Sequence, residues 1–112
     1  MSIPPAALLG AAILSEVMAT TALKASDGFT RLWPSLLAGL GYCISFYLLA
    51  QVMKSIPTGV VYAVLSGLGI VLISVVGWAV YGEKLDTAAV VGMAMIVAGV
   101  GVIQLFSKTA GH

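Results

Sequence analysis

The sequence predicts an all-α integral membrane protein with four transmembrane helices. Of its 112 residues, 61% are hydrophobic and only 8% are charged, whereas a soluble domain carries about 25% charged residues. Four stretches are apolar over about 20 residues, which is the length that a helix needs to cross a bilayer. Only short polar segments separate them, so residues 1–112 are expected to form one four-helix transmembrane domain.

Prolines, glycines and charged residues bound these four stretches. Asp27–Gly28 is a turn signal, and we expect Lys24, Asp27 and Arg31 in the first loop. Ile56–Pro57 makes the second connection, and the charged segment 82–86 makes the third. Such connections are too short for an extramembrane domain. The predicted helices cover about 5–23, 33–53, 58–81 and 87–106.

The composition argues against several classes of protein. A net charge of +1 gives no basic surface for nucleic acid. Cys43 is the only cysteine, which excludes an internal disulfide and a cysteine-based metal site. No glycine-rich loop with Lys–Ser/Thr is present to bind ATP. We therefore predict no metal, no cofactor and no catalytic residue, and hence a protein that is not an enzyme.

Glu16 is the only formal charge inside a predicted span, and it falls near the middle of that span. A carboxylate at that depth costs roughly 2.5–3.5 kcal/mol on insertion scales, so a functional site is the default interpretation. The alternative is a structural glutamate held by an internal partner. No lysine, arginine or histidine lies within another predicted span to be that partner.

The residues one helical turn from Glu16 leave room beside its carboxylate, because three of the four are small. They are Ala12, Ile13, Ala19 and Thr20. Thr20 also offers a hydroxyl group. These residues are the first candidates for a binding chamber.

The 58–81 helix supplies the next candidates. Tyr62, Ser66 and Gly69 share one face, and Tyr62 could donate its hydroxyl to Glu16 or present its ring to a cation. Gly67 and Gly69 form either a bend that can switch sides or a pair of packing glycines. Tyr42 in the 33–53 helix faces either the chamber or the lipid.

A buried carboxylate disfavours its ionised form, so it holds a proton or pairs with a cation. Aromatic rings nearby favour organic cations over hydrated metal ions. If the two ligands compete for Glu16, and the helices switch sides only when one is bound, protons move in as the cation moves out. This chemistry predicts a secondary active transporter.

Four helices make a thin bundle, so we expect a homodimer that brings two Glu16 carboxylates to one chamber. In the 87–106 helix, Ala88, Gly92 and Gly99 lie on one face where backbones could approach closely. The alternative is that glycine is simply common in membrane helices. Lysine and arginine number three on one side of the predicted membrane and two on the other, which leaves the orientation unfixed and allows an antiparallel pair.

At this point the chain resembles the bacterial small multidrug resistance family over essentially its whole length. The motifs are AILSEVMATTALKAS around Glu16, GFTRLWPS at 28–35, IPTGVVYAVLSGLGIVLIS at 56–74, YGEKLD at 81–86 and GMAMIVAGV at 92–100. The resemblance implies an antiparallel, dual-topology homodimer in the inner membrane. It implies exchange of protons for lipophilic or quaternary ammonium cations at the Glu16 residues of both subunits.

The resemblance also assigns positions in this chain. It implies a helix kink at Gly67 and Gly69 and a dimerisation motif at Gly92 and Gly99. It implies substrate-chamber positions at Ala12, Ile13, Ala19, Thr20, Tyr42, Tyr62, Leu65, Ser66 and Gly67.

Two positions bear on the branch of the family. Ala19 stands where guanidinium exporters usually carry tryptophan, which favours the multidrug branch. Leu65 stands where multidrug members usually carry a tryptophan that is thought to stack on planar cations. The leucine at position 65 has three possible explanations. The protein is adapted to another cation, it is one subunit of a heteromeric pair, or position 65 is altered in a variant.

The sequence as a whole predicts a proton-coupled multidrug exporter. The alternatives are an exporter of a small metabolite cation such as guanidinium or a polyamine, one subunit of a heteromeric pair, and a membrane subunit that only packs.

Overall fold

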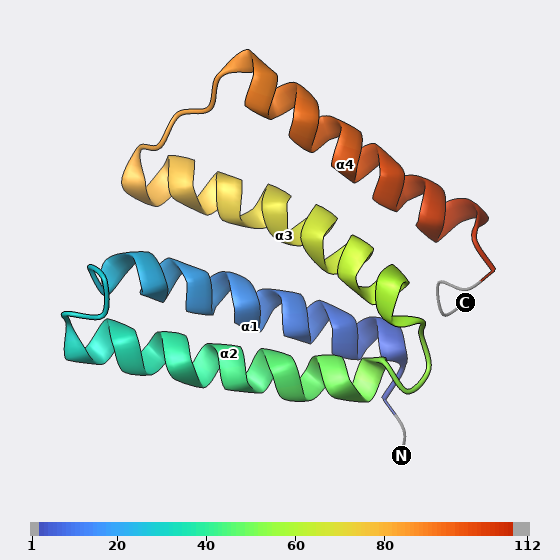
Figure 1. Cartoon of the computed structure of the whole chain (residues 1–112), viewed down its shortest axis with the longest axis horizontal. Helices are drawn as coiled ribbons and strands as arrows, with labels where there is room; N and C mark the ends of the chain where they lie inside the picture. Colours follow the sequence, from blue (N-terminus) through green and yellow to red (C-terminus); the bar gives the residue numbers. More distant parts are fainter. Residues whose placement is uncertain (1–2, 109–112) are drawn as a thin grey trace.

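The computed structural model describes residues 3–108, which form four helices (Figure 1). They are α1 (Pro5–Ala25), α2 (Leu32–Val52), α3 (Thr58–Tyr81) and α4 (Thr87–Phe106). All four are long and apolar enough to cross a membrane. The described chain is therefore all-α, as predicted, and the bounds of α3 and α4 agree with the sequence.

The first loop is shorter than the sequence predicts, and Lys24 lies in the last turn of α1 instead of in that loop. The helix continues because Ser26 closes it, with the Ser26 amide donating to the Ala22 and Leu23 carbonyls and its hydroxyl donating to the Leu23 carbonyl at 2.6 Å. Carbonyl groups in the last turn of a helix otherwise lack partners. A lysine there is also favoured by the helix dipole.

Two local signals fix the connection between α3 and α4. Gly82 ends α3 in the left-handed conformation, with φ of 67°, which glycine adopts at little cost. Asp86 begins α4, because its side chain accepts a hydrogen bond from the Ala89 amide at 2.9 Å. The segment between them has no regular secondary structure and carries Glu83 and Lys84.

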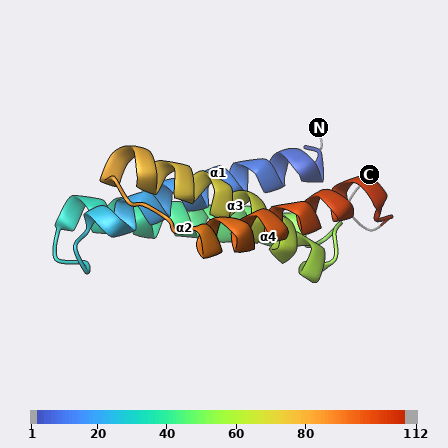
Figure 2. The same cartoon turned by 90° about the horizontal axis from the view of Figure 1, so that it is seen from above.

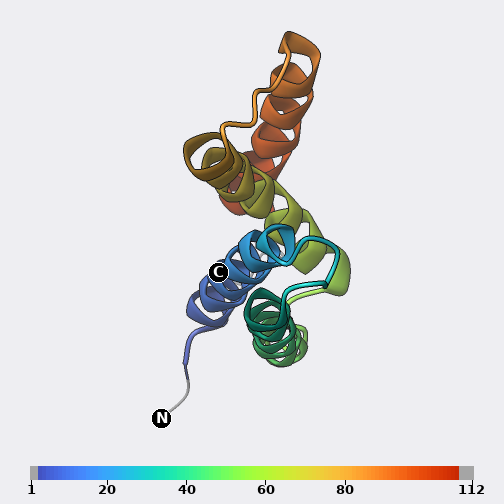
Figure 3. The same cartoon turned by 90° about the vertical axis from the view of Figure 1, so that its left-hand side faces the viewer.

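The helices form an open row in the order α2–α1–α3–α4 instead of a closed bundle (Figure 1). Helix α1 packs against both α2 and α3, and α4 packs against α3. Figures 2 and 3 show the row from above and from one end. Its extents are 43 × 38 × 19 Å, so the thinnest dimension is about two helix diameters. A row of this thickness cannot by itself enclose a chamber.

The core lies between α1, α2 and the first half of α3, and one residue of α4 joins it. Its buried residues are Leu9, Ala12, Ile13, Leu49, Val52, Ile56, Val61, Val64, Leu65 and Val100. In contrast, only 6% of the apolar window of α4 is buried. Because lipid solvates apolar side chains, the exposed faces are suited to lipid or to a second chain.

Helices α1 and α2 approach closely through small residues. A side-chain carbon at Gly41 would lie 2.7 Å from the Ala19 Cβ and 3.2 Å from the Ser15 carbonyl oxygen. Nearby, the buried Ser45 hydroxyl donates to the Ala12 carbonyl at 2.9 Å. Close packing and interhelical hydrogen bonds are the two forces that join helices in lipid. They hold α1 firmly against α2 and leave its other face toward α3.

Candidate functional site

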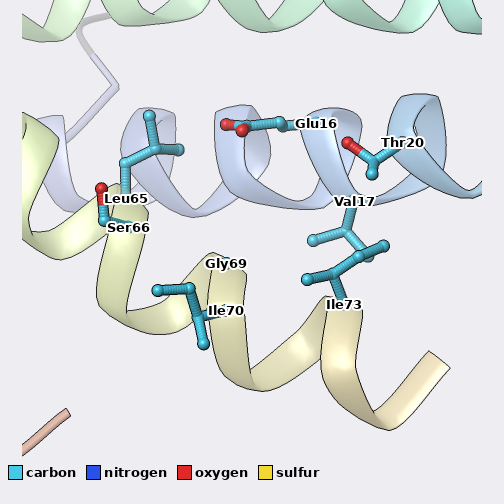
Figure 4. Close-up of a pocket in the computed structure, with 8 residues that line it drawn as sticks. All are labelled: Glu16, Val17, Thr20, Leu65, Ser66, Gly69, Ile70 and Ile73. Atoms are coloured by element: carbon cyan, nitrogen blue, oxygen red, sulfur yellow. The ribbon is translucent and has the colours of Figure 1, made fainter. Parts of the chain in front are cut away.

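A pocket of about 270 Å³ lies between α1 and α3, and Glu16 lines it (Figure 4). Helix α1 contributes Glu16, Val17 and Thr20, which are at adjacent positions or one turn apart. Helix α3 contributes residues that recur every three or four positions along one face. They are Leu65, Ser66, Gly69, Ile70 and Ile73. The pocket therefore combines one carboxylate and two hydroxyl groups with aliphatic walls.

Glu16 has no salt-bridge partner among residues 3–108. The ion pair found in this part of the chain joins Lys24 to Glu83, near the ends of α1 and α3. Glu16 is half-buried, and no described side chain or backbone group hydrogen-bonds to its carboxylate. The structural alternative, a glutamate neutralised from within the chain, therefore finds no support in these residues. A carboxylate in this state is free to take a proton or a cation.

Tyr42 reaches the site through Thr20. Their hydroxyl oxygens lie 2.7 Å apart in a hydrogen bond in which either can be the donor. Tyr42 belongs to α2 and does not line the pocket. Its ring also contacts Phe46 of the same helix, with the ring centroids 6.2 Å apart. The bond fixes the Thr20 hydroxyl one turn from Glu16. The place of Tyr42 in a substrate chamber stays a prediction.

Four other predicted chamber residues lie away from the pocket in the single chain. Ala12, Ile13 and Ala19 are 0%, 2% and 1% exposed. Ala12 and Ala19 meet Ser45 and Gly41 of α2, and Ile13 belongs to the core. Tyr62 is 56% exposed and does not line the pocket.

The two glycines of α3 differ from each other. Gly67 is buried, and a side-chain carbon there would overlap the Val100 Cγ2 atom of α4. Gly69 lines the pocket and has open space beside it. Helix α3 is continuous from Thr58 to Tyr81 through both positions. Gly67 thus lies in the α3–α4 contact and Gly69 lies at the site, and a kink at the two positions remains a prediction.

Gly92 and Gly99 lie on α4 with open space beside them. A side-chain carbon at either position would meet nothing within 4 Å among residues 3–108. They therefore take no part in packing α4 against α3. Their place in a dimer interface stays a prediction.

Three pocket residues were not predicted from the sequence, namely Val17, Ile70 and Ile73. All are aliphatic, so nothing in their chemistry distinguishes them from lipid-facing residues. Periodicity could have found two of them, because Ile70 and Ile73 follow Ser66 by four and seven positions along one helix face. No group of three or more His, Cys, Asp or Glu residues capable of holding a metal occurs within residues 3–108.

Comparison with known proteins identifies the family. A family model described as Small Multidrug Resistance protein matches residues 6–96. The chain belongs to the Small Multidrug Resistance family. Its four apolar helices and this membership make it a multi-pass membrane protein.

Relatives within the Small Multidrug Resistance family match almost the whole chain. "Multidrug transporter EmrE" of Escherichia coli is 53% identical over 96% of this chain and 98% of its own length. "Quaternary ammonium compound-resistance protein QacE" of Escherichia coli is 54% identical over 90% and 92%, respectively. "Quaternary ammonium compound-resistance protein QacF" of Klebsiella aerogenes is 51% identical over 93% and 94%.

Proposed function

We propose that this protein is a secondary active transporter that exports quaternary ammonium and other lipophilic cations in exchange for protons, across the inner membrane of a bacterium. The observation that carries the proposal is Glu16, an unpaired carboxylate in a pocket between two membrane-spanning helices. The names of the relatives, a multidrug transporter and two quaternary ammonium compound-resistance proteins, support the choice of substrate.

The pocket chemistry supplies the exchange. When Glu16 is ionised, its carboxylate attracts an organic cation, and the aliphatic walls from Leu65, Ile70 and Ile73 take up the lipophilic body. When Glu16 is protonated, that attraction is lost and the cation leaves. An ionised and empty carboxylate is the least favourable state at membrane depth. A protein that changes sides only with Glu16 protonated or paired therefore couples the two flows.

The hydroxyl groups in and around the pocket can hydrogen-bond to Glu16 and so influence whether it binds a proton or an organic cation. Thr20 lies one turn from Glu16, and its hydroxyl is oriented by the bond to Tyr42. Ser66 offers a second hydroxyl from α3. Hydroxyl groups can donate to an ionised carboxylate and can also accept from a protonated one. Both states of Glu16 can thus be satisfied without a fixed positive charge.

The transporter is proposed to work as an antiparallel homodimer. The row of four helices leaves one side of the Glu16 pocket uncovered, and a second chain would cover it with a second Glu16. The nearly balanced lysine and arginine count, three against two, supports insertion in both orientations. Gly92 and Gly99 on the exposed α4 are suited to close contact between subunits.

The test is transport into proteoliposomes with an imposed proton gradient, comparing the wild-type chain with Glu16→Gln. The panel contains quaternary ammonium compounds, planar aromatic dyes, guanidinium and polyamines. We expect quaternary ammonium transport that depends on the proton gradient and is abolished by Glu16→Gln in a folded protein. Equal transport by the two proteins would refute the proposal, because Glu16 would then have no role in coupling.

A second candidate, export of a small metabolite cation, is favoured by one observation. The pocket wall at position 65 is an aliphatic leucine, which offers no ring for stacking a planar aromatic dye and so favours a smaller cation. Guanidinium or polyamine transport without quaternary ammonium transport in the same panel would select this candidate. Transport that appears only with a co-expressed relative would instead indicate a heteromeric pair.

A further inference from the structure

An ammonium group is already bound near the loop ends of α1 and α3, away from Glu16. The Lys24 Nζ donates to the Glu83 Oε2 at 2.5 Å and lies 5.4 Å from the centre of the Tyr81 ring. The Tyr81 hydroxyl in turn donates to the Thr21 carbonyl at 3.0 Å. A carboxylate beside an aromatic face is the combination that binds organic ammonium ions. Here the bound cation is a side chain of the same protein.

The Glu83 carboxylate is held in place by the local backbone. Gly82 ends α3 with φ of 67°, and its amide donates to the Trp78 carbonyl at 3.2 Å, as in an αL cap. The Glu83 amide donates to the Gly77 carbonyl at 3.1 Å. The Glu83 side chain then folds back over α3. A side-chain carbon at position 77 would overlap the Glu83 Oε1 atom, so the glycine leaves the space that the carboxylate occupies.

Glu83 also lines a second pocket, with a volume of about 370 Å³. Trp78, Leu85 and Val90 give it aromatic and aliphatic walls, and Lys84 completes the lining. The Trp78 side chain is 66% exposed, so its ring is available to a ligand. The pocket has the chemistry of a lipophilic cation site, namely one carboxylate with apolar and aromatic surface around it.

The second pocket lies between α3, the α3–α4 connection and α4, and neither Tyr81 nor Lys24 lines it. Glu83 joins the two sides, because its carboxylate also pairs with Lys24 at the loop end of α1 and α3, the pair of helices that forms the Glu16 pocket. Thr20 lines the Glu16 pocket, and Thr21, the next residue, is bound by Tyr81. Lys24 follows Thr20 by four residues, which is about 6 Å along the helix axis. A cation that replaces Lys24 at Glu83 would therefore lie at the loop end of the α1–α3 contact, about one helical turn beyond the Glu16 pocket.

We propose that Glu83, Tyr81 and Trp78 form a second site for lipophilic ammonium ions, in which an arriving or leaving cation replaces the Lys24 ammonium. That the ion is a transported substrate rests on the proposed function. The exchange is feasible because the Lys24 and Glu83 side chains are 51% and 48% exposed. Exposed ion pairs change an equilibrium by a factor of about five or less. Replacing Lys24 also releases the link between α1 and the α3–α4 connection.

The site is tested by binding of benzyltrimethylammonium to the purified full chain carrying Glu16→Gln, which removes the main site. We expect weak residual binding. Adding Lys24→Gln removes the internal competitor and should strengthen this binding by a factor of up to about five. Adding Glu83→Gln instead should abolish it. Lys54→Gln removes a lysine from the connection between α2 and α3, and this control should leave the residual binding unchanged.

Two results would overturn the inference. One is residual binding that is the same with and without Glu83→Gln, which would indicate partition onto apolar surface. The other is absence of binding in the Glu16→Gln, Lys24→Gln protein while its helices remain folded by circular dichroism. In either case Lys24 and Glu83 form only a structural link between helices.

Transport by otherwise wild-type protein separates this inference from the proposed function. Glu83→Gln is expected to raise the KM for benzyltrimethylammonium and leave the maximal rate unchanged, because Glu16 remains intact. Wild-type transport with no effect of Glu83→Gln on KM or on binding would reject the second site alone. Absence of wild-type transport, with binding that still depends on Glu83, would reject the proposed function and leave a cation site.

Discussion

Replacing Gly67 with alanine should weaken the contact between α3 and α4. A side-chain carbon at this position would overlap the Val100 Cγ2 atom and lie 3.2 Å from the Val100 Cβ. Carbon atoms in optimal contact are about 3.5–4.0 Å apart. Rotating the valine side chain would move its Cγ2 but not its Cβ, so rotation alone cannot relieve the contact. The backbones of α3 and α4 must therefore separate.

The size of the effect follows from two opposing contributions. Overpacking of a buried contact costs about 1–3 kcal/mol. Alanine is favoured over glycine within a helix by about 1 kcal/mol. The net loss of stability for Gly67→Ala is thus about 0–2 kcal/mol. Gly69→Ala is a matched control, because Gly69 lies two residues away in the same helix and has open space beside it.

The measurement is reversible unfolding in mixed detergent and SDS micelles, followed by circular dichroism. Both variants gain the same helix propensity, so their difference reports the overpacking alone and should be about 1–3 kcal/mol. Adding Val100→Ala to Gly67→Ala removes the overlapping methyl groups and should recover part of the loss, measured as a coupling energy. Equal stability of Gly67→Ala and Gly69→Ala would refute the packing role of Gly67.

Three further predictions concern transport and assembly. Leu65→Trp adds an aromatic wall to the pocket and should strengthen binding of planar aromatic cations by about 0.5–1.5 kcal/mol; unchanged dye binding in a fluorescence titration would mean that no ligand stacks there. Gly99→Leu should shift the monomer–dimer equilibrium toward monomer in cross-linking experiments, and a dimer of wild-type strength would place the interface elsewhere than on α4. Binding of a quaternary ammonium ion should weaken as pH falls, because a protonated Glu16 cannot pair with it; in calorimetry, this pH dependence should disappear in Glu16→Gln. Binding that is equally strong at pH 6 and pH 8 in the wild-type chain would contradict competition at Glu16.

The fold could be predicted well from the sequence because lipid imposes strict rules on helices. A spanning segment must be apolar over its whole length and must satisfy its own backbone, so its limits are visible as charged residues, prolines and glycines. The prediction for α1 is less accurate, because it places Lys24 in the first loop and the structure places it in the last turn of the helix. A lysine is equally compatible with a loop and with the last turn of a helix, and the Ser26 cap decided between them.

The order of the helices in space could not be predicted. A closed bundle and an open row have the same apolar segments, and hydropathy does not distinguish a face that contacts lipid from one that contacts protein. The choice depends on close contacts such as Gly41 against Ala19 and Gly67 against Val100. Glycines are common in membrane helices, so their presence alone does not tell which helix they meet.

The centre of the site could be predicted, and its edges could not. Glu16 stands out in the sequence because a charge at membrane depth requires a reason. Thr20, Leu65 and Ser66 were also predicted, and they line the same pocket. Ala12 and Ala19 were assigned to the chamber for their small size. In the structure, their small side chains instead allow α2 to pack close to α1, and the Ser45 hydroxyl donates a hydrogen bond to the Ala12 carbonyl.

Glu16 and Glu83 carry the same carboxylate group, but their surroundings give the two groups different properties. Glu83 has a lysine partner and is half exposed, so water weakens the ion pair and a cation could exchange with it at small cost. Glu16 has no partner in the described chain and lies within a membrane-spanning helix, where an ionised and empty state is strongly disfavoured. A lysine beside Glu16 would remove that penalty and would also remove the need for a proton or a substrate. The proposed coupled exchange at Glu16 depends on the absence of such a partner within residues 3–108. Ser66→Lys should therefore keep the fold, as measured by circular dichroism, while abolishing transport into proteoliposomes.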